Sequence, residues 1–275
     1  MTSLRITRRL LDAGWCVLVP LGVTVAYLGV GVVSVIQEPI LSTVLVDGAL
    51  IVIVGALRLL RPRWLAYAPG PRPASGTPRF GRTVAGCAVL AFLAGQSLAL
   101  WLYTMGGSAG FDASIQYRQD AGAVLTLLLA LAVAPVAEEM LFRGLLYPLL
   151  RKRLGTTVSV LVTTAVFGLV HGNIVQFASA LPLAVLLALV FERTRRLWPC
   201  VLLHLGFNLA ATVIPAPALS GLANPVSGLL LNMAFAGCAL TLCRKITGTS
   251  SPVCVDGPGA DGQGEESEVD VPRSM

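Results

Sequence analysis

Long stretches without a charged residue limit the folds that this chain can adopt. Residues 14–36 and 83–105 each form a run of 23 residues without Asp, Glu, Lys or Arg. At about 1.5 Å of rise per residue, a helix of about 20 residues crosses a hydrocarbon core about 30 Å thick. Across the chain 55% of the residues are hydrophobic and only 12% are charged, against about 25% in a soluble domain. We therefore expect an all-α, polytopic integral membrane protein.

The apolar runs predict about eight transmembrane helices. The run 14–36 is longer than the apolar region of a signal peptide, so we expect a retained first span. Pro135, inside the fourth run, predicts a kink, and Asp47, inside the second, is interpreted as a boundary residue. The runs cover residues 14–36, 41–57, 83–105, 121–150, 157–170, 174–191, 199–214 and 226–243.

The basic residues predict the orientation of these helices. If the N-terminus is cytoplasmic, the segments on that side hold eighteen of the 20 Lys and Arg residues. Cytoplasmic loops carry such an excess, so we expect both termini in the cytoplasm and a multi-pass protein of the cell membrane. The cytoplasmic segments are then 1–13, 58–82, 151–156, 192–198 and 244–275.

We expect the chain to divide into three regions. Residues 1–120 hold the first three spans and a loop, 61–82, whose five prolines, three glycines and five arginines predict a flexible connector. Residues 121–245 form the candidate catalytic core of transmembrane helices. Residues 246–275, rich in Gly, Ser, Asp and Glu, predict a disordered cytoplasmic tail.

The charge pattern indicates what surrounds the protein, and the positions of the cysteines indicate whether their thiols are paired. The net charge of +6 comes from clusters between apolar runs, so we expect membrane lipid, and not nucleic acid, around the protein. The six cysteines form no CxxC pair, and five of them lie in or beside apolar runs. A cysteine in such a place is usually a small buried hydrophobic residue, so we expect free thiols.

Few ionisable side chains lie inside the predicted spans, where a charge is costly and marks function by default. The fourth run contains Glu138, Glu139 and Arg143, and the two histidines, His171 and His204, fall in other runs. Glu139 and Arg143 are four residues apart, so they share a helix face and can form a salt bridge. Glu138 is rotated by about 100° and can point elsewhere.

The remaining polar positions repeat the four-residue spacing. Phe167 precedes His171 by four residues, and His204 precedes Asn208 by four. A carboxylate beside an imidazole can act as a general base for water, and a second histidine and an amide can donate to an oxyanion. These side chains favour peptide hydrolysis. Straight helices would place His204, Glu138 and His171 at depths of about 12, 20 and 27 Å, so tilt or a kink is needed to join them.

Three short motifs occur in order on successive predicted helices, between about residues 121 and 210. They are Glu138-Glu139-x-x-x-Arg143, Phe167-x-x-x-His171 and His204-x-x-x-Asn208. Together they resemble the motifs of the CPBP family of intramembrane proteases. That family groups type II CAAX prenyl proteases with Abi-like proteins of bacteriocin processing and immunity. One motif alone would carry little weight, whereas the ordered set of three is specific.

The resemblance implies a role for each motif residue. Glu138 would be the principal catalytic carboxylate, and His171 would help to activate water. His204 and Asn208 would stabilise the oxyanion. The residues that would support the site are Glu139, Arg143 and Phe167.

Two alternatives remain for the cofactor. Glu138, His171 and His204 could hold a catalytic zinc, with Glu139 as the base, because two histidines and one glutamate are an accepted ligand set. We favour a site without metal or other cofactor. The chain lacks HExxH, and a zinc ligand at His204 would need no asparagine one turn later, whereas Asn208 suits an oxyanion donor.

The function predicted from these features is that of an intramembrane endopeptidase. Its substrate is expected to be a membrane-associated, lipidated or leader peptide. The alternative is an immunity or peptide-binding protein of the same fold that does not depend on proteolysis. A transporter is disfavoured, because we find no inverted repeat in the sequence.

Overall fold

The computed structural model describes residues 39–67 and 78–247, together with 14, 17–18, 21–23 and 25–26. All regular structure in these parts of the chain is helical, which confirms the all-α prediction. Most of the predicted first span and nearly all of the predicted tail lie outside the described residues. The elements are α2 (Pro39–Leu60), α3 (Pro62–Leu65), α4 (Pro78–Gly106), α5 (Ala109–Ala121), α6 (Ala123–Leu128), η1 (Leu129–Val133), α7 (Ala134–Leu141), η2 (Phe142–Leu146), α8 (Tyr147–Arg151), α9 (Thr156–Leu169), α10 (Ile174–Thr194), α11 (Leu197–Val213), η3 (Ala216–Leu222) and α12 (Pro225–Thr247).

Five of the described helices are long and apolar enough to cross a membrane. They are Ser42–Leu60, Pro78–Gly106, Ala123–Arg151, Ile174–Thr194 and Pro225–Cys243. Their outer faces expose large apolar side chains, such as Val52, Val124 and Leu229 at 69%, 83% and 63%. So much exposed apolar surface is unfavourable in water and suits contact with lipid. The protein is therefore a multi-pass membrane protein.

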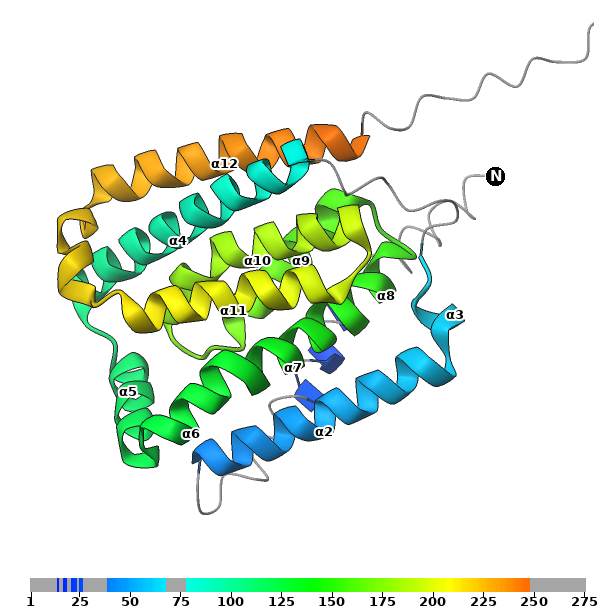
Figure 1. The fold of residues 1–275 in the computed structure, drawn as a ribbon, viewed down its shortest axis with the longest axis horizontal. Helices are drawn as coiled ribbons and strands as arrows, with labels where there is room; N and C mark the ends of the chain where they lie inside the picture. Colours follow the sequence, from blue (N-terminus) through cyan, green and yellow to red (C-terminus); the bar gives the residue numbers. More distant parts are fainter. Residues whose placement is uncertain are drawn as a thin grey trace, which may run out of the picture.

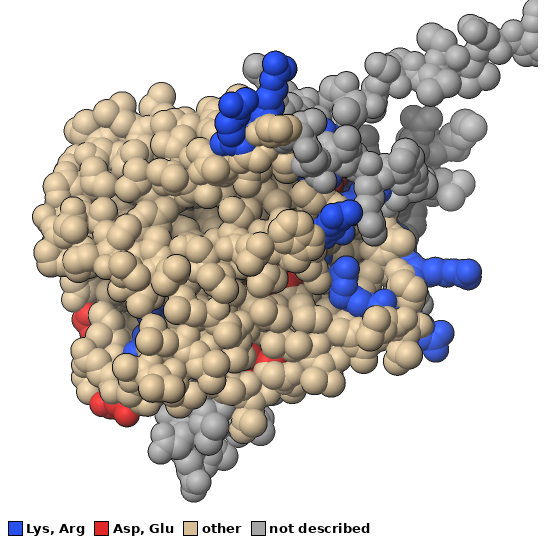
Figure 2. All heavy atoms as spheres, in the orientation of Figure 1, with Lys and Arg blue, Asp and Glu red and all other residues tan. Residues whose placement is uncertain are grey.

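Two further helical units complete the described bundle. α11 and η3 pass the same test only as one pair bent by 98°, and α9 is an apolar helix of 14 residues. Figure 2 shows Lys and Arg gathered toward one end of the molecule, the end at which α3 and α8 lie in Figure 1. This one-sided charge agrees with the predicted orientation. The count of eight spans and the cytoplasmic termini stay predictions.

The long helices lie side by side in one bundle (Figure 1). α10 packs along α4 and α9 and also contacts α11 and α12, while α2 packs on α7. Leu186, Leu187 and Phe191 of α10 are 0%, 0% and 2% exposed, so this helix lies at the centre of the main core. Helices from both sides of residue 120 therefore build a common core.

Two segments between predicted spans contain helices. The loop predicted at 61–82 holds α3, and α4 begins inside it, at Pro78. Proline suits the first turn of a helix, where an N–H has no intrahelical partner, so prolines that suggest a flexible linker begin two helices instead. α5 occupies the segment before the fourth span. Ser108 caps it by accepting a hydrogen bond from the Phe111 N–H at 3.3 Å, and Gly122, with a φ of 81°, ends it.

The prediction of free thiols is wrong for two of the six cysteines. Cys87 of α4 and Cys238 of α12 form a disulfide, with Cα atoms 5.8 Å apart. The bond spans 151 residues of sequence, so only the packing of α4 along α12 brings the two side chains together. Cys200 is buried as a free thiol, as predicted, and Cys16 and Cys254 lie outside the described residues.

A very close contact between α4 and α10 depends on Gly95. A Cβ atom at this position would meet the backbone oxygen of Ser179 and lie 3.2 Å from the Cα of the same residue. Small residues let membrane helices approach in this way. We expect Gly95→Ala to lower the free energy of unfolding by about 1–3 kcal/mol, the usual cost of overpacking. Thermal unfolding in detergent, followed by circular dichroism, measures this loss.

Gly86→Ala, in the same helix, is the matched control. Nothing lies within 4 Å of a Cβ atom built at Gly86, so this variant should melt at or slightly above the temperature of the wild type. Equal Tm values for the two variants would contradict the close contact at Gly95.

Candidate active site

The fourth predicted span carries the candidate site on a short helix, α7, between two π-helical segments. η1 ends two residues before Pro135, and η2 ends two residues before Pro148. A proline has no N–H to donate, so a carbonyl of the preceding turn loses its helical partner, and a widened π turn accommodates the loss. The structure thus has a π segment at the place where Pro135 predicts a kink.

Side chains from two other helices bind carbonyl oxygens in these π segments. The Asn208 amide of α11 donates to Ala130 O at 2.9 Å, and this oxygen lies five residues before the first of the two prolines. Arg58 Nη1 of α2 donates to Gly144 O at 3.0 Å, four residues before the second proline. Donors from its neighbours therefore hold α7 at both ends, in place of backbone hydrogen bonds that the prolines remove.

Glu139 is the buried anchor of the site. Its side chain is 0% exposed, and Oε1 accepts hydrogen bonds from Arg143 Nη1 at 2.9 Å and from His204 Nδ1 at 3.0 Å. Arg143 is also 0% exposed. Its Nη2 donates to Ala184 O at 2.8 Å, and its guanidinium carbon lies 5.0 Å from the ring centre of Phe167. The salt bridge predicted from the spacing is present, and it ties α7 to α10 and α11.

His204 of α11 lies between the two glutamates. Because a carboxylate only accepts hydrogen bonds, the contact with Glu139 assigns a proton to His204 Nδ1. Nε2 then faces Glu138, whose Oε2 is 3.9 Å away. Glu138 Oε2 is buried without a hydrogen-bond partner among the described residues, while the side chain as a whole is 17% exposed. The pair therefore places a carboxylate oxygen without a partner beside an imidazole nitrogen.

The structure does not bring all of the predicted catalytic residues into contact. Phe167, 1% exposed, contacts both imidazoles, with its ring centre 5.3 Å from that of His171 and 5.7 Å from that of His204. His171 Nδ1 donates to Phe167 O at 2.8 Å. Within the described residues, no hydrogen bond or ion pair joins His171 to Glu138. Asn208, one turn after His204, uses one amide N–H in the π segment and keeps the other.

The segment that carries this geometry matches a known family. Residues 120–210 match the profile of the type II CAAX prenyl endopeptidase Rce1-like family. The match confirms the kind of family predicted from the three motifs, and we call residues 120–210 the Rce1-like segment.

One curated protein is similar to part of this chain. YdiL of Bacillus subtilis (strain 168), named as a candidate membrane peptidase, is 24% identical over 139 residues. The aligned part covers 45% of this chain and 54% of that protein, so the chain spans about half the length of the relative. No solved structure matches the chain.

The residues of the Rce1-like segment that could hold zinc do not form a ligand set in this structure. Glu138 and His204 approach one another, whereas no hydrogen bond or ion pair among the described residues joins His171 to either of them. Among residues 39–67 and 78–247, no three His, Cys, Asp or Glu side chains are grouped closely enough to hold a metal ion. A zinc site at these three positions would require His171 to move toward the other two.

Sequence reasoning missed two groups that position the Rce1-like segment. Arg58 precedes the segment, and from the sequence we expect it to be one of the basic residues of a cytoplasmic loop. Pro148 indicates that Gly144 O lacks a helical hydrogen-bond donor. The sequence does not show which side chain donates to it instead. Glu192, at the end of α10, binds Arg151 Nη2 at 2.8 Å and accepts from the Tyr147 hydroxyl at 3.0 Å, so it anchors α8.

Proposed function

We propose that the protein is an intramembrane endopeptidase that hydrolyses a membrane-associated, lipidated or leader peptide. The family match of residues 120–210 and the likeness of the chain to a candidate membrane peptidase support a membrane protease. The observation that carries the proposal is the pair formed by Glu138 and His204. A carboxylate oxygen with no partner among the described residues faces an imidazole nitrogen at 3.9 Å. In a low-dielectric site such a pair can activate water and stabilise an oxyanion.

In the proposed reaction, Glu138 takes a proton from a water molecule while the water oxygen attacks the scissile carbonyl carbon. The π electrons of the carbonyl move to its oxygen, and the resulting oxyanion faces donors from α11. These donors are the Nε2–H of a protonated His204 and the second amide N–H of Asn208. Glu138 then gives its proton to the departing amine as the C–N bond breaks, which restores the carboxylate.

In the proposed reaction His204 carries a second proton, on Nε2. Glu138 and Glu139 are negative, and Arg143 and the imidazolium are positive, so the cluster is neutral as a whole. A cluster without net charge costs less to bury than one with an uncompensated ion. Glu139 holds Nδ1 and so fixes the direction of Nε2, as a carboxylate does beside the histidine of serine proteases. His171 is proposed to assist through a water molecule, because no direct contact joins it to Glu138.

A comparison of membrane peptides from matched cells tests the proposal. One strain expresses the wild-type protein and the other expresses Glu138→Gln, which keeps the side-chain shape but cannot act as the base. We expect mass spectrometry of the membrane fraction to find peptide termini made only by the wild type. Purified wild-type protein in nanodiscs should cleave the corresponding synthetic peptide. Identical termini in both strains, at equal protein levels, would contradict proteolysis and favour the immunity or peptide-binding alternative.

We also expect cleavage to persist without bound metal. His171 does not share a ligand position with Glu138 and His204 among the described residues. Active protein treated with a chelator should keep its rate, and elemental analysis should find zinc well below one ion per chain. Stoichiometric zinc whose removal stops cleavage, and whose return restores it, would show that this expectation is wrong.

A further inference from the structure

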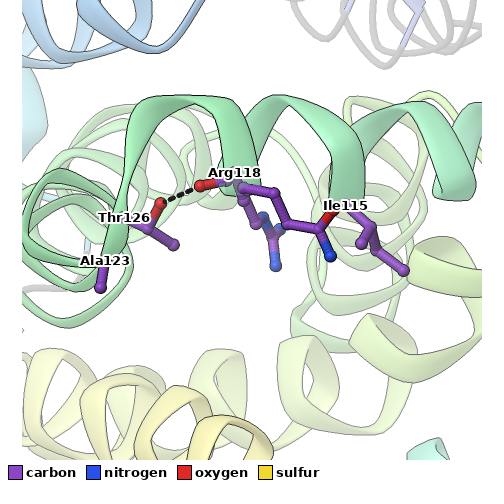
Figure 3. A pocket seen from close by; sticks show the side chains of 5 residues that line it. Ile115, Arg118, Ala123 and Thr126 are labelled. Carbon is purple, nitrogen blue, oxygen red and sulfur yellow. Dashed lines mark hydrogen bonds between the residues drawn. The ribbon is translucent and has the colours of Figure 1, made fainter.

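A hollow of about 310 Å³ lies at the elbow between α5 and α6, far along the helix from the candidate active site. Figure 3 shows Arg118 extending from α5 toward the space between this elbow and the neighbouring helices. The Thr126 hydroxyl donates to Arg118 O at 2.8 Å, so α6 fixes the backbone from which the side chain extends. The hollow is lined by Ile115, Arg118, Gln119, Ala123 and Thr126.

The guanidinium of Arg118 forms no ion pair with any described carboxylate. Two aspartates share its helix, but each accepts a hydrogen bond from a different side chain. Asp112 accepts from the Tyr103 hydroxyl at 2.8 Å, and Asp120 accepts from the Gln116 amide at 2.9 Å. Between residues 83 and 142, Arg118 is also the only lysine or arginine in the sequence. It is therefore an isolated cation.

Arg118 is also incompletely hydrated. Its side chain is exposed through the open mouth of the hollow, yet enough protein surrounds it that burial lowers the pKa of Arg118. A partly desolvated cation without a counter-ion is unfavourable, and an anion in the hollow would relieve that cost. The side-chain amide of Gln119, which makes no hydrogen bond to a described residue, provides a second donor beside it.

The position of α5 fits the level of lipid headgroups. Figure 1 shows α5 at one end of the bundle, lying across the direction of the long helices. It connects two candidate spans, Pro78–Gly106 and Ala123–Arg151, so it lies where the chain turns at a membrane surface. Tyr103 and Tyr117, 36% and 50% exposed, add aromatic side chains of the kind that gather at this interface.

We propose that the hollow beside Arg118 binds the phosphate group of a phospholipid headgroup. The planar guanidinium can bind two phosphate oxygens at once, and the Gln119 amide can donate to a third. Ile115 and Ala123 supply an apolar wall for the glycerol and the first carbons of an acyl chain. Inorganic phosphate from solution has the same binding chemistry, so the two sources need separate tests. The site does not depend on the proposed proteolysis.

Native mass spectrometry of the full chain, released from nanodiscs of phosphatidylcholine and phosphatidylglycerol, measures the retained lipid. We expect the wild type to keep a phosphatidylglycerol that Arg118→Gln loses, with retention lowered by about fivefold, the effect of one cation beside an anionic headgroup. Arg118→Lys keeps the charge without the planar fork and should fall between the two. Arg82→Gln, at the far end of α4, is the matched control and should retain lipid as the wild type does.

A second arm uses the same proteins in phosphatidylcholine nanodiscs with added inorganic phosphate. We expect no rise in Tm with phosphate. A rise that Arg118→Gln abolishes would assign the hollow to free phosphate and overturn the lipid proposal. Equal lipid retention by the wild type and Arg118→Gln, or an equal loss in Arg82→Gln, would overturn it as well. Both arms measure binding, so their failure would leave the proposed proteolysis unaffected.

Discussion

Arg143→Met is expected to destabilise the folded protein by about 3–5 kcal/mol. The substitution removes the guanidinium that binds Glu139 Oε1 at 2.9 Å and Ala184 O at 2.8 Å. It leaves the fully buried Glu139 carboxylate with His204 as its remaining polar contact. An uncompensated charge in a membrane core has no water to solvate it, which is why the loss should be large. The readout is Tm in detergent, by size-exclusion chromatography of heated samples.

The double variant Glu139→Gln/Arg143→Met is the matched control. It removes both charges, so no unpaired ion stays in the core, and it should be more stable than Arg143→Met alone. If the single and double variants melt together, stranded charge is not the cause of the loss. A wild-type Tm in Arg143→Met would contradict the buried salt bridge itself.

His204→Phe is expected to lower the cleavage rate by about 10²–10⁴-fold while the protein still folds. Phenylalanine keeps a ring against Phe167, whose centre lies 5.7 Å from the imidazole. It removes the nitrogen that faces Glu138 and the nitrogen that binds Glu139. Arg143 still pairs with Glu139, so the loss of stability should be smaller than in Arg143→Met.

Cleavage of the peptide identified in cells, by purified protein in nanodiscs, measures the effect of His204→Phe. Leu202→Phe, in the same helix and 56% exposed, is the matched control. It adds a ring on the outer face of α11 and should keep the wild-type rate. A wild-type rate in His204→Phe would remove His204 from the mechanism, whereas a loss in both variants would trace the effect to the packing of α11.

The salt bridge and the membrane class follow from local rules of sequence. A spacing of four places Glu139 and Arg143 on one helical turn whatever surrounds them, and apolar runs of span length require lipid. Contacts between helices do not follow in the same way. Counting along straight helices separates Glu138 from His204 by about 8 Å in depth, whereas the structure brings Glu138 Oε2 and His204 Nε2 to 3.9 Å. The π segments and the packing of α11 on α7 make that difference.

Asp47 is a single residue whose packing against neighbouring helices does not follow from the sequence. Its place in an apolar run suggests the edge of the membrane, yet the structure buries it to 1% exposure on α2, the helix that packs on α7. The disulfide between Cys87 and Cys238 could not be predicted either, because composition does not show which faces of two distant helices meet. A run of residues shows that a helix is buried in lipid or protein, but not which neighbour covers each of its sides.

The hydrogen bond from Arg58 to Gly144 O bears on any attempt to build a smaller enzyme. A chain trimmed to residues 120–210 would keep α7, both prolines and every motif side chain. It would lose Arg58, and the interior of a membrane offers no water to take over an orphaned carbonyl. A trimmed protein would therefore need a new donor for Gly144 O, supplied by a grafted helix or by redesign of α8. The region that matches the family profile is therefore shorter than the region whose helices must pack together to form the site.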